Sequence, residues 1–338
     1  MKFQTSFLLK NRHIQTTYAS LFRKVPKLSI EIEKFSLSDG DFVEAYWHKI
    51  ANHTDTTPIV ILFHGLTGSF ESPYIQGVMS ALERAKISSV LMHFRGCSGK
   101  ENLKARSYHS GDTQDALEFT RSVKKRYPHA TLFAVGYSLG ANVLLKLLGE
   151  TKENSPFNAA VAVSAPMRLD LCANKMNRGF SRFYQHLLLK DLHLSLEKKY
   201  EHHDMQKLIG LKKENIKNLK NFWEFDEVYT AKVNGFESAQ DYYTKSSSKQ
   251  YLRSIKIPTL IIHAKDDPFM TEAVIPKQEE VSDSVELEIS ENGGHVGFVS
   301  GSLLKPNYWL DERVVSFFND QLHLSSFEDQ NALFPSSH

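Results

Sequence analysis

The sequence predicts a doubly wound α/β fold, a mostly parallel sheet with helices on both faces. Five short apolar runs follow one another along the chain, at residues 58–63, 87–94, 131–135, 159–163 and 258–263. They are apolar at successive positions rather than at alternate ones, as in strands buried on both faces. Amphipathic stretches of helical spacing separate them, and this alternation of strand and helix is typical of a parallel sheet covered by helices.

The composition is that of a globular protein and excludes several other classes. Of the 338 residues, 41% are hydrophobic and 24% are charged, which excludes a disordered chain. The 41 Lys and Arg against 39 Asp and Glu give a net charge of +2, so no strong overall field points to nucleic acid or acidic lipid. Cys97 and Cys172 are too few for a disulfide framework or a four-cysteine zinc site. One bridge between them is conceivable, but free thiols in a reducing compartment are favoured.

No segment predicts secretion or a membrane span. Only three consecutive apolar residues, Phe7, Leu8 and Leu9, precede Lys10, too few for the core of a signal peptide. The densest apolar run, residues 59–63, is far shorter than the ~20 residues that a membrane helix needs. We therefore expect a cytoplasmic protein.

The chain is expected to have four parts. Residues 1–57 form an N-terminal segment that adds strands at the sheet edge, residues 58–166 and 251–320 form the core, and residues 321–338 form a polar tail. Residues 167–250 interrupt the strand pattern with lysine-rich helical sequence, and we interpret them as a cap over the sheet. Twelve aromatic residues lie between Phe180 and Tyr251. We expect most of them to form the core of the cap and a minority to line a substrate pocket.

The strongest chemical signal is the sequence Gly-Tyr-Ser-Leu-Gly at residues 136–140, which follows one expected strand and opens a helical run at 141–148. A Gly-x-Ser-x-Gly motif between strand and helix forms a nucleophile elbow, a tight turn that exposes the serine hydroxyl in a cleft. The motif alone is weak, because chance predicts on the order of a tenth of a match in a chain of this length. Its context predicts Ser138 as a nucleophile.

A serine nucleophile needs a histidine base, which in this arrangement follows it in the sequence. Three histidines lie beyond the last buried strand. His338 is the final residue and His323 follows a helical run, whereas His295 lies in a glycine-rich loop after the strand-like residues 285–289. Such a loop can bring an imidazole back to the serine, so we select His295.

The carboxylate that orients this histidine is expected where the strand at residues 258–263 ends, because the acid precedes the histidine in this order. Asp266 and Asp267 are adjacent there. Neighbouring side chains point in different directions, so only one of the two reaches Nδ1 of His295. We favour Asp267, immediately before the turn-fixing Pro268, and interpret Asp266 as a turn or helix-entry carboxylate.

Two backbone N–H groups are needed to stabilise an oxyanion. One is expected at Leu139, directly after the nucleophile. The other is expected at Leu66, in the loop after the first central strand, where Gly65 gives the backbone room to approach. His64 ends that strand, and two interpretations are about equally favoured: it orients this loop, or it is simply a packed histidine. We expect Arg95 to brace the loop that carries Cys97.

Several strings of this sequence resemble the YheT-like branch of the α/β-hydrolases; they lie at residues 64–69, 72–74, 92–99, 108–112, 136–142, 225–231, 266–269 and 293–295. Residues 12–16 (Arg-His-Ile-Gln-Thr) resemble the N-terminal Pro-His-Leu-Gln-Thr segment of that branch, with Arg12 in place of the proline. After the elbow serine, this chain has Gly-Ala-Asn where members often have Gly-Gly-Asn. The resemblance covers roughly residues 11–318, and it implies an α/β-hydrolase fold and a serine hydrolase, usually called an esterase.

The residues and the resemblance together predict a serine esterase with a Ser138–Asp267–His295 triad, an acyl-enzyme intermediate, and no cofactor or metal. The expected substrate is a small-molecule ester with an apolar acyl group, and no nucleic-acid partner is expected. Acyl chain length, leaving group and oligomeric state stay open. An acyltransferase or thioesterase that uses the same acyl-enzyme is the first alternative. A non-catalytic binding scaffold is less favoured, because no member of the triad is missing.

Overall fold

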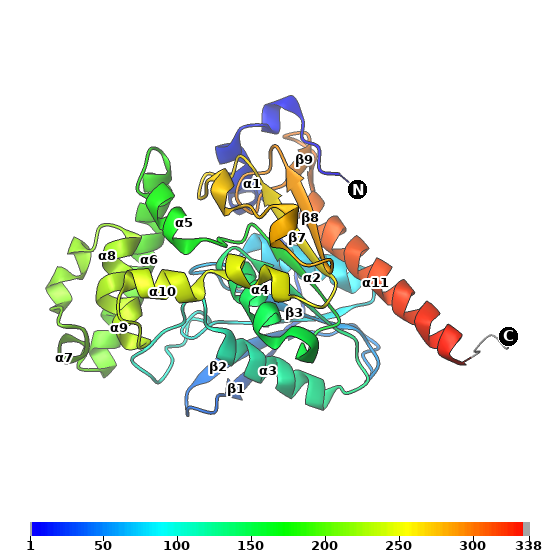
Figure 1. Ribbon diagram of the computed structural model, residues 1–338, viewed down its shortest axis with the longest axis horizontal. Coiled ribbons are helices and arrows are strands. Elements are labelled where there is room, and N and C mark those ends of the chain that lie inside the picture. The colour runs from blue at the N-terminus through cyan, green and yellow to red at the C-terminus, as the bar shows by residue number, and fades with distance from the viewer. Residues whose placement is uncertain (1, 334–338) are drawn as a thin grey trace.

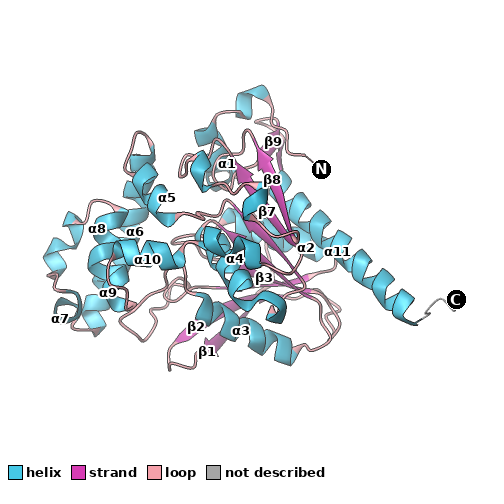
Figure 2. Cartoon of the chain, viewed as in Figure 1, coloured by secondary structure: helices cyan, strands magenta, loops and turns pink. Residues whose placement is uncertain are grey.

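The computed structural model describes residues 2–333, with side chains described through residue 324. An eight-stranded sheet crosses the centre of the molecule in the order β1-β2-β4-β3-β5-β6-β7-β8 (Figure 2). Strand β2 pairs antiparallel with β1 and with β4, and all the other pairs are parallel. The strands are β1 (Glu31–Ser36), β2 (Phe42–His48), β3 (Ile59–Phe63), β4 (Ser88–Met92), β5 (Leu132–Tyr137), β6 (Ala159–Val163), β7 (Thr259–Ala264) and β8 (Val285–Ser290).

The strands from β3 to β8 lie within one or two residues of the apolar and strand-like runs of the sequence. Strands β3 to β7 are buried at every position, which explains why their sequences are apolar without alternation. Strand β8 lies at the sheet edge, and only its first residue is buried. The predicted doubly wound α/β fold is therefore confirmed.

Helices cover both faces of the sheet (Figure 1). In β3, Ile59, Ile61 and Phe63 pack against one layer, which contains α3 (Thr113–Arg126) and α4 (Leu139–Thr151). Val60 and Leu62 pack against the other layer, which contains α2 (Pro73–Arg84) and the beginning of α11 (Trp309–Leu333). Successive side chains of a strand point to opposite faces, so one buried strand contributes to two cores.

Helix α11 extends beyond the expected core boundary at residue 320. Residues 321–333, which were expected to begin a polar tail, continue the helix (Figure 1). They contain no proline or glycine, and Leu322 still packs against the sheet core, so no local signal ends the helix there. The expected tail from 334 to 338 lies outside the described residues.

The insertion between β6 and β7 is helical and gathers on the left side of Figure 1. It has a core of its own, which includes Leu189, Leu196, Met205 and Ile216. A single π-helical turn, Asp226–Thr230, interrupts it. Its α-helices are α5 (Leu169–Met176), α6 (Ser181–His202), α7 (Met205–Ile209), α8 (Phe222–Phe225), α9 (Ala231–Val233) and α10 (Ala239–Ser246).

The N-terminal helix α1 (Arg12–Phe22) lies against a small hairpin near the other end of the chain, β9 (Val299–Gly301) and β10 (Pro306–Tyr308). The buried amide of Gln15 donates to the carbonyl oxygen of Val299 at 2.8 Å and accepts from the N–H of Val299 at 2.7 Å. The sequence did not predict this helix. Within the described residues, no helix is both long enough and apolar enough to cross a membrane.

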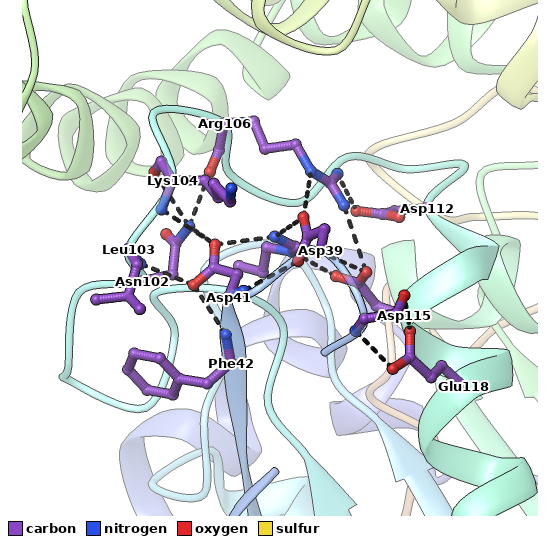
Figure 3. Close-up of polar contacts among 12 residues, drawn as sticks. Asp39, Asp41, Phe42, Asn102, Leu103, Lys104, Arg106, Asp112, Asp115 and Glu118 are labelled. Atoms are coloured by element: carbon purple, nitrogen blue, oxygen red, sulfur yellow. Dashed lines mark hydrogen bonds and ion pairs between the residues drawn. The ribbon is translucent and has the colours of Figure 1, made fainter. Parts of the chain in front are cut away.

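Arg95, in the loop after β4, joins the β1–β2 turn to α3, and the carboxylates that surround it are drawn in Figure 3. Its guanidinium group donates to Asp115 at 2.6 and 2.7 Å and to Asp39 and Asp41 at 2.9 and 2.8 Å. Burial pushes the pKa of Asp41 upward, but hydrogen bonds from Asn102 and from backbone N–H groups outweigh it and lower this pKa to about 2. The expected bracing by Arg95 is thus visible as a buried ionic network.

Candidate active site

Ser138 lies in the sharp turn between β5 and α4, with φ +51° and ψ −119°. This positive φ is costly for a residue with a side chain, so the surrounding packing must hold it. A Cβ atom on Gly136 would lie 2.5 Å from the Gly140 carbonyl oxygen, and one on Gly140 would lie 2.4 Å from the Phe63 oxygen. The two glycines of the motif are therefore required sterically, and the turn presents Ser138 to a cavity.

The structure brings His295 and Asp267 to Ser138 across a long stretch of sequence. The Ser138 hydroxyl lies 2.9 Å from Nε2 of His295, and Nδ1 of His295 lies 2.8 Å from Oδ2 of Asp267. The other oxygen of Asp267 accepts from the N–H of Phe269 at 2.8 Å. A carboxylate on Nδ1 fixes the tautomer in which Nε2 accepts from the serine. The three side chains form one continuous hydrogen-bonded chain.

Asp266 points to the backbone of the histidine loop rather than to the imidazole. Its Oδ1 accepts from the N–H of Gly294 at 2.9 Å. The next N–H, of His295, donates to the hydroxyl of Thr16 on α1 at 3.0 Å, and the N–H of Val296 donates to Ser164 at 3.1 Å. Three consecutive N–H groups are thus anchored by side chains from three separate parts of the chain.

The imidazole of His295 is also held on its face. The ring of Phe269 stacks on it with centroids 4.1 Å apart and an interplanar angle of 14°. Phe269 in turn contacts Tyr184 of α6, with ring centroids 5.0 Å apart. Sequence reasoning assigned no role to Phe269, Thr16 or Ser164. The available signals were the resemblance of residues 12–16 and 266–269 to the YheT-like branch.

The loop after β3 lies directly beside Ser138, because a Cβ atom on Gly65 would be 3.3 Å from that of Ser138. The hydroxyl of Tyr74 accepts from the N–H of Gly65 at 3.0 Å, and that of Tyr108 accepts from the N–H of Thr67 at 2.9 Å. Between them, the N–H of Leu66 has no acceptor among the described residues. Leu66 and Leu139 both line the same cavity as Ser138.

His64 joins this loop to the next one. Its Nδ1 donates to the carbonyl oxygen of Gly65 at 2.7 Å, and its Nε2 accepts from the N–H of Phe94 at 3.1 Å. Burial lowers its pKa to about 3, so the ring is neutral. Of the two interpretations of His64, these contacts favour the loop-orienting one over simple packing.

A cavity of about 690 Å³ extends from Ser138 and His295 into the helical insertion. It is walled by α1, by the loops after β3 and β4, and by α5, α6 and α10. Six of the twelve aromatic residues from Phe180 to Tyr251 line it, rather than the expected minority: Tyr184, Phe222, Phe225, Tyr229, Tyr242 and Tyr243. The expectation put too few rings at the cavity, because all of these except Tyr184 also belong to, or pack against, the hydrophobic clusters of the insertion.

The surroundings of the two cysteines do not activate their thiols. Cys97 and Cys172 are free, and burial raises the pKa of both thiols, that of Cys97 to about 12. In the part of the chain that the structure describes, no cluster of three or more His, Cys, Asp or Glu is arranged to hold a metal ion.

Known proteins share both this sequence and this architecture. The chain is 42% identical to "Putative esterase YheT" of Escherichia coli (strain K12) over 316 residues, which covers 94% of this chain and 92% of that protein. It is 27% identical to "Phospholipase ABHD3" of Homo sapiens over 304 residues, 88% of this chain and 73% of that one. The crystal structure of the Pyrococcus furiosus esterase Pf2001 superimposes with a TM-score of 0.55 at 19% identity, covering 88% of this chain and 91% of that one. At that identity, the likeness is one of fold.

A family model described as the alpha/beta hydrolase fold matches residues 58–302, which span β3 to β9. The matched region includes Ser138, Asp267 and His295. The strand order and the serine elbow agree with that match. The chain therefore belongs to the α/β-hydrolase family and, within it, to the YheT-like group of esterases.

Proposed function

We propose that this protein is a serine esterase that cleaves carboxylic esters through an acyl-enzyme. The observation that carries the proposal is the hydrogen-bonded chain from Ser138 through His295 to Asp267 at the wall of an apolar cavity. Relatives whose names contain esterase, phospholipase and monoacylglycerol lipase support ester hydrolysis as the reaction class.

In the first half-reaction, the oxygen of Ser138 bonds to the acyl carbon while its proton passes to Nε2 of His295. The imidazolium that forms is stabilised by Asp267, 2.8 Å from Nδ1. When the tetrahedral intermediate collapses, the ester C–O bond breaks and Nε2 returns the proton to the departing alcohol. In the second half-reaction, His295 takes a proton from a water molecule whose oxygen bonds to the acyl carbon. The bond from that carbon to the Ser138 oxygen then breaks, His295 returns the proton to the serine, and the acid leaves.

The oxyanion is stabilised in this proposal by the N–H groups of Leu66 and Leu139. Leu139 is the first residue of α4, so its N–H has no partner within the helix and lies at the positive end of the helix dipole. The N–H of Leu66 is kept available because Tyr74 and Tyr108 bind the N–H groups on either side of it. Removing one such donor typically costs about 10²–10³ in kcat.

The acyl group is assigned to the part of the cavity that enters the insertion, where the walls are aromatic and aliphatic side chains, among them Met176, Leu188 and Phe225. Burying each CH₂ group there contributes roughly 0.8 kcal/mol, so an apolar acyl chain is favoured over a polar one. The name of the phospholipase relative fits a lipid ester.

The first test is hydrolysis of a series of p-nitrophenyl esters from acetate to palmitate. We expect Ser138→Ala to lower kcat by about 10⁴-fold or more. Ser195→Ala is the matched control, because it removes a hydroxyl from the wall of the same cavity, and it should keep most of the activity. Equal rates for the parent and Ser138→Ala would refute the serine mechanism.

A second pair of variants tests the acid. Asp267→Asn should lower kcat by about 10⁴-fold, since an amide favours the wrong imidazole tautomer. Asp266→Asn should cost less than tenfold, because Asp266 bonds the Gly294 N–H and an amide oxygen can still accept there. Equal losses in the two variants would contradict the assignment of Asp267. Product analysis with added alcohols or thiols separates hydrolysis from acyl transfer, which starts from the same acyl-enzyme.

A further inference from the structure

Positive charge is concentrated in three segments of the chain, which we call the basic rim: residues 2–30, 171–190 and 299–310. They contain no Asp or Glu, whereas the whole chain has 39. Arg23 is ion-paired with Asp311, and no ion pair involves any of the other rim cations within the described residues. The Lys and Arg residues of the rim are Lys2, Lys10, Arg12, Arg23, Lys24, Lys27, Lys175, Arg178, Arg182, Lys190 and Lys305.

The three segments meet at α1, although they are distant in sequence, and two of them line the cavity. On α1, Nδ1 of His13 lies 3.1 Å from the Tyr184 hydroxyl of α6, and its ring lies 4.4 Å from that of Phe180. Further along α1, the hydroxyl of Tyr18 donates to the carbonyl oxygen of Leu303 in the β9–β10 hairpin. Both α1 and α6 contribute walls to the cavity that holds Ser138. Figure 1 shows α1 and β9 together at the top of the molecule.

The rim also exposes large apolar side chains. It holds eleven of the sixteen exposed large hydrophobic residues in the described chain but less than a fifth of the residues. Leu304 is 94% exposed, Phe7 84% and Leu21 69%, and in α6 Phe183 is 53% exposed and Leu187 47%. Leu187 is both exposed and part of the cavity wall. Protruding apolar residues flanked by Lys and Arg are the signature of a protein that lies in the interface of a membrane.

We propose that the basic rim is a docking surface for an anionic lipid bilayer, from which the cavity takes its substrate; the second clause rests on the proposed esterase function. The apolar side chains would enter the headgroup layer and the cations would meet lipid phosphates. This places α1 and α6, which both line the cavity, at the lipid surface.

The charge of the rest of the molecule supports an anionic bilayer as the partner of the basic rim. Outside the rim, the chain has 30 Lys and Arg against 39 Asp and Glu. An anionic surface therefore attracts the rim and repels the remainder, which orients the molecule with the cavity toward the bilayer. The net charge of +2 averages over these two regions and hides the difference.

The experiment is co-sedimentation of the full-length protein with vesicles, either of phosphatidylcholine alone or of phosphatidylcholine and phosphatidylglycerol in equal amounts. We expect binding to the anionic vesicles only, weakened by added salt. Each rim cation should contribute about fivefold to the partition coefficient, so the triple variant Lys10→Gln, Lys24→Gln, Arg182→Gln should bind roughly 100-fold less tightly.

The matched control is Arg121→Gln, Lys125→Gln, Lys152→Gln, which removes three exposed cations on α3 and after α4, away from α1 in Figure 1. It should bind like the parent. A second variant, Phe7→Ser with Leu304→Ser, keeps the charge and should also bind more weakly. Ser138→Ala should bind like the parent, so docking is measured separately from ester hydrolysis.

Several outcomes would overturn the proposal. They are no sedimentation with either vesicle, equal binding to neutral vesicles, or equal loss of binding in the rim and control triple variants. A reversible dimer in sedimentation velocity that the rim substitutions abolish, without vesicle binding, would instead assign the surface to a second copy of this chain.

Discussion

At the scale of single residues, His295 is held through its backbone as well as through its ring. Asp266, Thr16 and Ser164 each accept from one of three consecutive N–H groups of its loop. Because a displacement of about 1 Å at a reacting group can cost 10²-fold in rate, these anchors matter even though none of them reaches the substrate carbonyl in the proposed mechanism. We regard Thr16 as a positioning residue.

Thr16→Ala should lower kcat by roughly five- to tenfold with little change in KM, because it removes one hydrogen bond of about 1 kcal/mol from the loop. Thr16 lies on α1, outside the part of the cavity that enters the insertion. Thr16→Ser keeps the hydroxyl and should restore most of the rate. Steady-state kinetics on one p-nitrophenyl ester measures both values.

Thr17→Ala is the control for this prediction. Thr17 is the next residue of α1 and also lines the cavity, but its hydroxyl donates only to the carbonyl oxygen of His13. If the Thr16 and Thr17 variants lost activity equally, the effect would come from helix α1 as a whole and not from the bond to His295.

The residues that sequence reasoning found at the site share one property: each follows from a local pattern. Ser138 lies in a motif between a strand and a helix, and Asp267 and His295 follow the ends of strands. Thr16 and Ser164 could not be found in this way, because their contacts join residues 279 and 132 positions apart. Nothing in the local sequence distinguishes a threonine that meets a loop near the other end of the chain.

At the scale of secondary-structure elements, the Arg95 network fastens the antiparallel edge of the sheet to α3. Asp41 accepts from Arg95, from Asn102 and from two N–H groups of the loop that follows β4. Its side chain is fully buried, whereas that of Asp39, on the same guanidinium group, is 37% exposed. The two carboxylates therefore differ in what their removal costs.

Asp41→Asn should lower the free energy of unfolding by about 3 kcal/mol, because a buried guanidinium group loses a charged partner. Asp39→Asn, at the exposed side of the same network, should lower the free energy of unfolding by less than about 1 kcal/mol. Urea denaturation measures both. The difference between parent and Asp41→Asn should shrink as the pH falls from about 4 toward 2, where Asp41 itself becomes protonated.

The elements that the sequence predicted and those it missed differ in how they are stabilised. Strands β3 to β7 are buried on both faces, so their apolar composition is sufficient to identify them. Helix α1 has no such signal, because it is stabilised by the Gln15 amide and by packing of Tyr18 with Leu9 and Val299. The extension of α11 was missed because polar composition was interpreted as a tail, although these residues contain no proline or glycine to end the helix and Leu322 still packs against the core.

At the scale of the whole molecule, stability is expected to be unevenly distributed. Each of the strands β3 to β7 is hydrogen-bonded on both sides, whereas β9 and β10 pair only with each other in a separate two-stranded sheet. Regions with few buried contacts open at a lower free energy than the core.

Amide hydrogen exchange followed by mass spectrometry should therefore show the slowest exchange in β3, β5 and β6. The β9–β10 hairpin should exchange at least tenfold faster, since about 1.4 kcal/mol less opening energy gives that ratio. Exchange in the hairpin as slow as that in β5 would contradict this distribution. The fold class followed from the sequence, but this ranking did not, because it depends on which strands become edges.

The two hydrogen bonds between Gln15 and Val299 have a consequence for association between molecules. An amide side chain occupies both the N–H and the C=O of a β9 residue, as a neighbouring strand would. Exposed strand edges are templates for pairing with other molecules, and native proteins cover or interrupt them. Here a glutamine near the start of the chain covers an edge near its other end. A molecule whose first helix detached would thus offer an unprotected hairpin edge to its neighbours and become prone to aggregate.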